Sequence, residues 1–155
     1  MNKKQNVDKL RLEENTSPFQ AERSGLICGT GPLHYHNYIE LELITQGQGS
    51  QIVNGKQVPL SVGDIYVLRP LDSHQIYGEN LVIEKFIVSE SILGEQILFK
   101  LYTIINPLIV HLDSDEFAAV ASIMRAAEKE QRDPAEYSNV LCSKICLLYT
   151  SDAAD

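Results

Sequence analysis

The strongest constraint on the fold is a series of short β-rich segments that runs from residue 26 to about residue 88. Glycine, proline, asparagine and aspartate separate these segments at a spacing of roughly ten residues, which is typical of a β-sandwich or barrel. Asn54-Gly55 lies between QIV and KQV and predicts a tight hairpin, because both central residues of such a turn need a positive φ. We expect a second chain reversal at Gly47 and Gly49.

Strands and helices are expected to occupy different parts of the chain. An apolar strand at 65–68 ends at the turn RPLD, and the alternation in LVIEKFIV predicts another strand at 81–88. After Ser89 apolar residues recur every three to four positions, which predicts helices at 92–105, from about 113 to 133, and from 134 through 148. The expected fold class is mainly β with C-terminal helices.

The composition fits one intracellular domain. The chain has 155 residues and a formal net charge of -8, which argues against direct nucleic-acid binding by this fragment. Its three cysteines, Cys28, Cys142 and Cys146, lack the spacing of a disulfide framework, which favours reduced thiols and a cytoplasmic location. No apolar run reaches the ~20 residues that cross a bilayer, so we expect no membrane partner.

The clearest candidates for a functional site are His34, His36, Glu40 and His74. On a strand His34 and His36 project to one face. Glu40 keeps that parity if the strand continues, or can rejoin that face after a short turn at Asn37-Tyr38. His74 follows the next strand and turn, about where a barrel would bring it back across. Three imidazoles and a carboxylate suit a divalent transition metal such as Zn, Ni, Fe or Mn. If one histidine stands off, two histidines and one carboxylate remain.

Two segments around these residues resemble the motifs of the cupin family. HYHNYIELELITQG at 34–47 is similar to the first motif, HxHxxxE followed by six residues and a glycine. GDIYVLRPLDSH at 63–74 is similar to the second motif, a Gly-Asp strand that leads to a proline and a histidine. The spacing from Pro70 to His74 is one residue shorter than in the usual enzymes, and this shorter form resembles the N-terminal half of AraC-type transcription regulators.

The resemblance to AraC-type regulators implies a cupin jelly-roll barrel that binds a small-molecule effector and a homodimer formed through the C-terminal helices. It divides the chain into an N-terminal arm at 1–20, a cupin β-barrel at 21–90 and a helical dimerisation and linker segment at 91–150. Residues 151–155 form a tail of doubtful origin. The resemblance implies no enzymatic activity, and a DNA-binding domain would lie outside this fragment.

Five further residues are candidates for effector binding, namely Tyr38, Glu42, Tyr66, Tyr77 and Arg69. Tyrosine rings and hydroxyls suit stacking and hydrogen bonding to a carbohydrate, which is one candidate effector. Glu42 shares the parity of Glu40, so an inward Glu42 would need a cation or polar ligand nearby, whereas a bulge would turn it outward. Arg69 could face a carboxylate or phosphate, or could be an ordinary surface residue at a strand end.

The alternative function is a stand-alone metal-dependent cupin enzyme, such as a dioxygenase or an isomerase, with the same four ligands. Three features favour the sensor: the shorter second motif, the helices at 91–150 that a minimal barrel enzyme does not need, and the lack of a further catalytic group. Beyond the metal ligands, no clear general base or nucleophile stands out in the sequence. Cys142 and Cys146 lie four residues apart on one face of the last helix, where we expect core or dimer packing.

Overall fold

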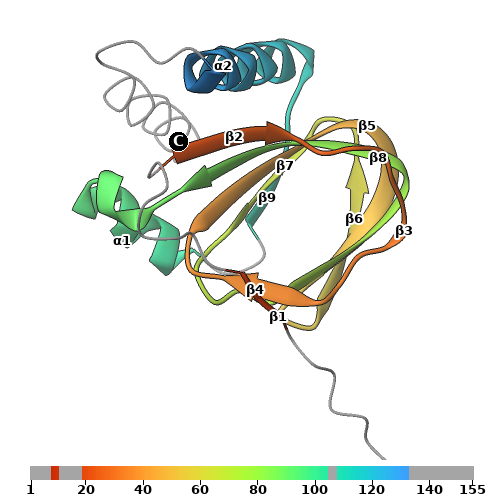
Figure 1. Ribbon diagram of the computed structural model, residues 1–155, viewed down its shortest axis with the longest axis horizontal. Helices are drawn as coiled ribbons and strands as arrows, with labels where there is room; N and C mark the ends of the chain where they lie inside the picture. The colour runs from red at the N-terminus through yellow and green to blue at the C-terminus, as the bar shows by residue number, and fades with distance from the viewer. Residues whose placement is uncertain (1–7, 11–18, 105–107, 133–155) are drawn as a thin grey trace, which may run out of the picture.

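A computed structural model describes residues 8–10, 19–104 and 108–132. The strands are β1 (Asp8–Leu10), β2 (Phe19–Arg23), β3 (Ile27–Thr30), β4 (His34–His36), β5 (Ile39–Val53), β6 (Lys56–Ser61), β7 (Asp64–Leu68), β8 (His74–Val88) and β9 (Leu108–His111). The helices are the 3-10 helix η1 (Glu90–Ile92) and the α-helices α1 (Glu95–Thr103) and α2 (Ser114–Arg132). The strands curl into a barrel, and the helices lie outside it (Figure 1). The expected fold class, mainly β with helices after the barrel, is confirmed.

Two strands of 15 residues, β5 and β8, form the centre of the barrel wall. They pair antiparallel from Ile39 opposite Val88 to Val53 opposite His74. The other edge of β8 is covered in turn by β4, β3 and β2, and the other edge of β5 by β7 and β6. Outside the irregularities around Gln46, the register of β5 and β8 therefore fixes which side of the wall each side chain faces.

The bend in β5 lies at Gly47 and Gly49, where we expected a chain reversal. The strand instead continues through both glycines, and its register with β8 shifts on either side of Gln46. Gly47 has a φ of +80°, and a Cβ added there would lie 2.2 Å from the backbone oxygen of Asn80. A Cβ on Gly49 would lie 2.1 Å from the backbone oxygen of Tyr77. The expected reversal is wrong, because the strand continues through an irregularity next to Gly47 and a close approach to β8 at Gly49.

The predicted hairpin is present, whereas part of the C-terminal region forms a strand instead of a helix. Asn54 and Gly55 connect β5 to β6 with φ values of 49° and 80°, which confirms the predicted tight turn. β9 lies within the range expected to be helical, and it pairs antiparallel with β7. The helix expected at 134–148, with Cys142 and Cys146, lies outside the described residues. None of the helices in the described ranges is long and apolar enough to cross a membrane.

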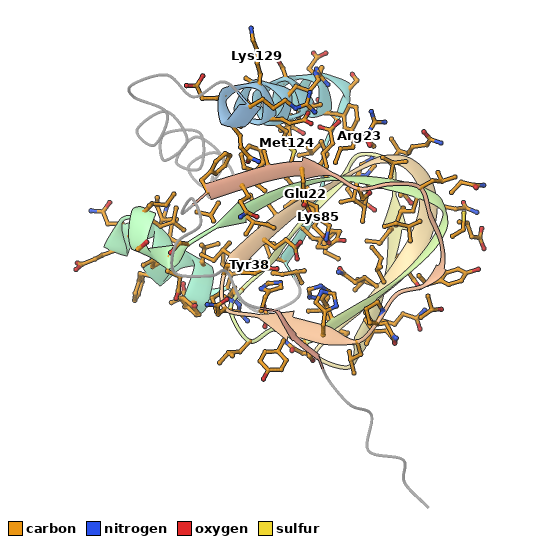
Figure 2. All side chains as sticks on the ribbon, in the orientation of Figure 1. Glu22, Arg23, Tyr38, Lys85, Met124 and Lys129 are labelled. Carbon is orange, nitrogen blue, oxygen red and sulfur yellow. The ribbon has the colours of Figure 1, made fainter. Side chains whose placement is uncertain are left out.

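α2 packs on the outer face of the barrel. Its buried residues contact two strands, and the cluster comprises Val120, Ala121, Met124 and Ala127 of α2 with Phe19 and Ala21 of β2 and Phe86 and Val88 of β8. Met124 points from the helix toward the strands, and Lys129 points away from them (Figure 2). Gln131 also accepts a hydrogen bond of 2.5 Å from the backbone N–H of Ala21, which ties the end of α2 to β2.

In the first half of β5, apolar side chains lie outside the barrel beneath the helices, and charged side chains lie inside it. This is the reverse of the usual pattern of a barrel with an apolar interior. Ile39 and Leu43 pack in the clusters beneath α1 and α2. Glu40 and Glu42 alternate with them on the opposite face and are nevertheless buried. Farther along the barrel the interior is apolar, with a cluster of Ile44, Val53, Leu60, Tyr66, Leu68, Leu81 and Ile83. The barrel thus encloses one charged zone beside one apolar zone.

We predict that Gly49→Ala lowers the free energy of unfolding by about 1–3 kcal/mol, because the new methyl group overlaps the backbone of β8, which cannot yield like a flexible side chain. Gly25→Ala is the matched control, since a Cβ there meets no atom within 4 Å. Urea unfolding followed by far-UV circular dichroism measures both variants. Equal stability of the two variants would contradict the close approach of β5 and β8.

Candidate functional site

The histidines of the two motifs meet where β4 and β8 begin to pair. His34 of β4 lies opposite His74 of β8 in the register, and His36 is two residues farther on the same face. The turn before His74 is held in place by the backbone N–H of Leu71, which donates to the His36 carbonyl oxygen at 2.9 Å. β4 and the turn that precedes β8 therefore set the positions of these rings together.

The hairpin turn between β5 and β6 also positions His74. The side-chain amide of Asn54 donates to Asp72 at 2.7 Å, and its carbonyl oxygen accepts from the backbone N–H of Ser73 at 2.9 Å. Asp72 in turn accepts a hydrogen bond from the backbone N–H of Arg69 at 2.8 Å. Burial opposes ionisation of Asp72, but these hydrogen bonds outweigh it and lower the pKa of its carboxyl group. The ionised carboxylate of Asp72 thus holds the turn before His74 in place through these hydrogen bonds.

His36, Glu40 and His74 present one ligand atom each, and all three atoms lie within 4.8 Å of one another. His36 Nε2 is 3.1 Å from Glu40 Oε2, and His74 Nε2 is 3.8 Å from the same oxygen. His36 Nδ1 lies 2.8 Å from the Tyr38 carbonyl oxygen, which can only accept, so Nδ1 is the hydrogen-bond donor. This orientation aims Nε2 at Glu40 and His74, where it could bind a metal.

This arrangement fits a divalent transition metal. The buried His36 Nε2 and Glu40 Oε2 make no well-aligned hydrogen bond, despite their short separation. Buried polar atoms without partners are rare in proteins, and two imidazoles with a carboxylate are a common ligand set for such metals. The bond from His36 Nδ1 to a backbone carbonyl is also the usual outer contact of a metal-bound histidine.

His34 stands beside this group and is not part of it. Its ring centroid is 4.0 Å from that of His74 but 6.4 Å from that of His36, and its Nδ1 lies 3.1 Å from the Pro32 carbonyl oxygen. In the part of the chain that the structure describes, three of the four expected metal ligands therefore converge, and His34 packs against one of them.

Glu42 points inward, and the cation beside it is Lys85. Lys85 Nζ lies 2.6 Å from Glu42 Oε1 and 2.8 Å from Glu40 Oε1. Lys85 projects from β8 into the ring of strands, close to the end of β5 that carries both carboxylates (Figure 2). Our sequence reasoning missed Lys85, although its parity with the buried Ile83 and Ile87 in LVIEKFIV was a usable signal.

The charges in this cluster follow from burial and from mutual contact. Burial alone would raise the pKa of Glu40, but the His36 ring and the Lys85 charge outweigh it and lower the pKa to about 2. Burial would lower the pKa of Lys85, yet Glu42 and Glu40 raise it above its ordinary range. Burial lowers the pKa of His74 to about 3, despite the attraction of Glu40. Glu40 is therefore ionised, Lys85 is charged and His74 is neutral at pH 7.

Tyr38 and Tyr66, two of the residues predicted to bind an effector, both border the cluster. Tyr38 stacks on His36 with ring centroids 4.2 Å apart and planes 6° from parallel. Burial and the nearby Glu40 raise the pKa of Tyr38 to about 12. Tyr66 lies opposite Glu42 in the β5–β7 register and is wholly buried. The Tyr66 hydroxyl and the Oε1 atom of Gln51, a residue that our sequence reasoning missed, are buried without a well-aligned hydrogen bond.

Tyr77 and Arg69 lie elsewhere. Tyr77 is 42% exposed, and its hydroxyl donates to Glu79 at the barrel surface. Arg69 pairs with Asp72 at 3.3 Å and donates to the carbonyl oxygens of Leu101 and Ile104, so it fastens the end of α1 to the turn before β8. Side-chain alternation along β8 directs Tyr77 outward. The turn between β7 and β8 directs Arg69 toward α1. The structure thus brings neither residue to the cluster.

The comparison with protein families identifies the strands around this cluster. Residues 29–80 match the family described as the AraC-like ligand binding domain. The match runs from β3 into β8 and includes His36, Glu40, Glu42 and His74. A search of curated proteins by sequence found no match.

Solved structures show the same fold. An apo form of ToxT from Vibrio cholerae matches with a TM-score of 0.64 at 9% identity, over 91% of this chain and 57% of the ToxT chain. A second ToxT structure from Vibrio cholerae gives a TM-score of 0.54 at 14% identity, over 89% of this chain and 56% of that chain. A cupin barrel protein from Salinispora arenicola gives a TM-score of 0.44 at 19% identity, over 52% of this chain and 71% of that chain. The chain thus spans little more than half the length of ToxT and has the fold of that part of ToxT.

We predict that the protein binds Zn²⁺ and that His74→Ala weakens this binding by more than about 100-fold, because changes in outer contacts alone cost about 10- to 100-fold. His111→Ala is the matched control, since His111 is exposed and pairs with Asp64 away from the cluster. His34→Ala should keep most of the affinity. Equilibrium dialysis with metal analysis measures all three variants, and a larger loss for His34→Ala than for His74→Ala would contradict the assignment.

Proposed function

We propose that the chain is the effector-binding and dimerisation part of a cytoplasmic transcription regulator of the AraC type. The barrel binds a small molecule beside the cluster of His36, Glu40, Glu42, His74 and Lys85, and the C-terminal helices join two copies. A DNA-binding domain elsewhere in the regulator responds to the bound state. The chain itself is not an enzyme and does not contact nucleic acid.

The observation that carries this proposal is the position of the charged cluster within the AraC-like match. The matched residues 29–80 contain four of the five members of the cluster, and Lys85 follows on the same strand as His74. Polar atoms of His36, Gln51 and Tyr66 are buried without a well-aligned hydrogen bond, although the Tyr66 hydroxyl interacts with Glu42 and Gln51. A polar ligand would satisfy them, which is the usual reason for such atoms at a binding site.

Two strands connect this interior cluster to α2. On β8, Lys85 faces inward and its neighbour Phe86 packs beneath α2. On β2, Glu22 lies opposite Lys85 in the register, while its neighbour Ala21 contacts α2 and bonds to Gln131. Figure 2 shows Glu22 and Lys85 near each other beneath the helix. An effector that binds two positions of these strands unequally would shift α2 and the residues that follow it.

The proposed effector class is a carbohydrate or another hydroxyl-rich molecule. Tyr66 and Gln51 supply hydroxyl and amide groups, and Tyr38 and His36 supply stacked rings beside them. A divalent metal, if present, would be held by His36, Glu40 and His74 and would act as a Lewis acid toward a ligand oxygen. In that case the metal would add one strong contact to a mainly hydrogen-bonded ligand.

A metal-dependent cupin enzyme remains the second candidate, because one observation favours it. Two histidines and a carboxylate with converging ligand atoms leave coordination positions for a substrate and for oxygen or water. Oxygen consumption by the Fe²⁺-loaded chain with small organic substrates would support this candidate. The AraC-like match over the same residues favours the regulator.

We predict that residues 1–155, fused to a DNA-binding domain that represses only as a dimer, repress a reporter gene. Residues 1–132 in the same fusion should fail to repress, because the helix expected at 134–148 is missing. Reporter activity measures the effect, and immunoblotting shows that both fusions accumulate equally. Equal repression by the two fusions would place the dimer surface elsewhere in the chain.

We also predict that a carbohydrate within a panel of sugars and sugar acids raises the melting temperature of the protein. Saturation at 100 times the Kd corresponds to about 2.7 kcal/mol of stabilisation. Tyr66→Phe should reduce this shift, because it removes an interior hydroxyl, whereas Tyr77→Phe removes an equivalent hydroxyl at the surface and should not. Thermal unfolding across the panel makes the comparison. A panel without any stabilising sugar would reject the carbohydrate class.

A further inference from the structure

Glu40 divides its two carboxylate oxygens between different partners. Oε2 faces the Nε2 atoms of His36 and His74 at 3.1 and 3.8 Å. Oε1 accepts a hydrogen bond of 2.8 Å from the Lys85 ammonium group. A metal held by the two imidazoles and Oε2 would therefore share its carboxylate ligand with a cation of the protein itself.

Lys85 does not depend on Glu40 for its position. Its Nζ lies closer to Glu42 Oε1, at 2.6 Å, and Glu42 is directly opposite Lys85 in the register of β5 and β8. Gln51 Nε2 lies 3.5 Å from the other oxygen of Glu42. Because Glu42 is itself held between two partners, it anchors the ammonium group and presents it to Glu40.

We propose that Lys85 is an internal competitor for the metal site: anchored on Glu42, its ammonium group holds Glu40 and weakens the binding of a divalent cation. This inference rests on the metal part of the proposed function. The ammonium repels a divalent cation at short range, where little water screens the charges. It also occupies Oε1, so that Glu40 can offer the metal only Oε2. A carboxylate shared in this way donates less electron density to a metal.

The consequence is a site that takes up a metal reversibly. A ligand that draws Lys85 away from Glu40 would strengthen metal binding, and by linkage the metal would strengthen the binding of that ligand. Glu42 and Lys85 line the same interior as Tyr66, which lies opposite Glu42 in the β5–β7 register. The competition therefore gives effector and metal a direct physical connection through one side chain.

A simpler role for Lys85 is to neutralise two buried carboxylates, and the loss of Lys85 alone would not separate the two roles. The double variant Lys85→Gln with Glu42→Gln separates them, because it removes one positive and one negative charge together. Both amides are similar in size to the groups they replace, and the net charge of the interior stays the same. Glu40, however, is released from the ammonium group.

The test is a titration of the purified 155-residue chain with Co²⁺ at constant pH, by calorimetry and by visible absorption of the bound ion. The double variant should bind Co²⁺ at least about 10-fold more tightly than the wild type, the scale typical of changes in outer contacts. Lys85→Arg keeps the positive charge and should stay near the wild-type affinity. Far-UV circular dichroism and thermal unfolding establish that each variant is folded.

A folded double variant that binds Co²⁺ no more tightly than the wild type overturns the proposal. Should the double variant not fold, Glu42→Gln alone decides: it leaves Lys85 with Glu40 as its remaining carboxylate partner in the cluster, so Co²⁺ binding must weaken, and equal or tighter binding overturns the proposal. Absence of Co²⁺ binding by the wild type and by every folded variant rejects both this inference and the metal site. The sugar-dependent stabilisation tests the effector function separately.

Discussion

The register between β5 and β8 is the constraint on which the site depends. It places Glu42 opposite Lys85 and Val53 opposite His74, so one ladder positions residues that are far apart in the sequence. A slip of one residue would exchange the two faces of β5 and would carry Glu40 and Glu42 out of the barrel. The buried charges reinforce this register, because an ammonium and two carboxylates that lost each other would each be buried without a partner.

Much of the site could be predicted from short-range rules. Side-chain parity on a strand put His34 with His36 and Glu40 with Glu42, and the proline turn before His74 pointed to a ring that returns to the same place. Because a buried carboxylate without a partner is costly, an inward Glu42 was expected to have a cation or a polar ligand nearby, and the structure supplies Lys85. The lysine itself could have been found, because its inward parity beside buried isoleucines was already visible in the sequence.

Other features could not be predicted, because they depend on contacts between distant segments. A pair of glycines in a sequence can mark either a chain reversal or an irregularity within one strand. The pairing of β5 with β8 and the close approach of β8 to Gly49 decide between the two. β9 is four residues long, so its short apolar run inside a helical pattern carries too little periodicity to identify a strand. The role of Arg69 depends on the position of α1, because its guanidinium group donates to the carbonyl oxygens of Leu101 and Ile104. The sequence around Arg69 does not reveal this contact.

The packing of α2 on the barrel would restrict the motion that the proposed function assigns to this helix. Beneath the helix lie Phe19 and Phe86, and its last turn satisfies a backbone N–H of β2 that β8 does not use. Complete detachment of α2 would expose an apolar surface and an unpaired edge of β2. Both features promote aggregation. If α2 transmits the proposed effector signal, a slide or a tilt of the helix would keep this surface covered.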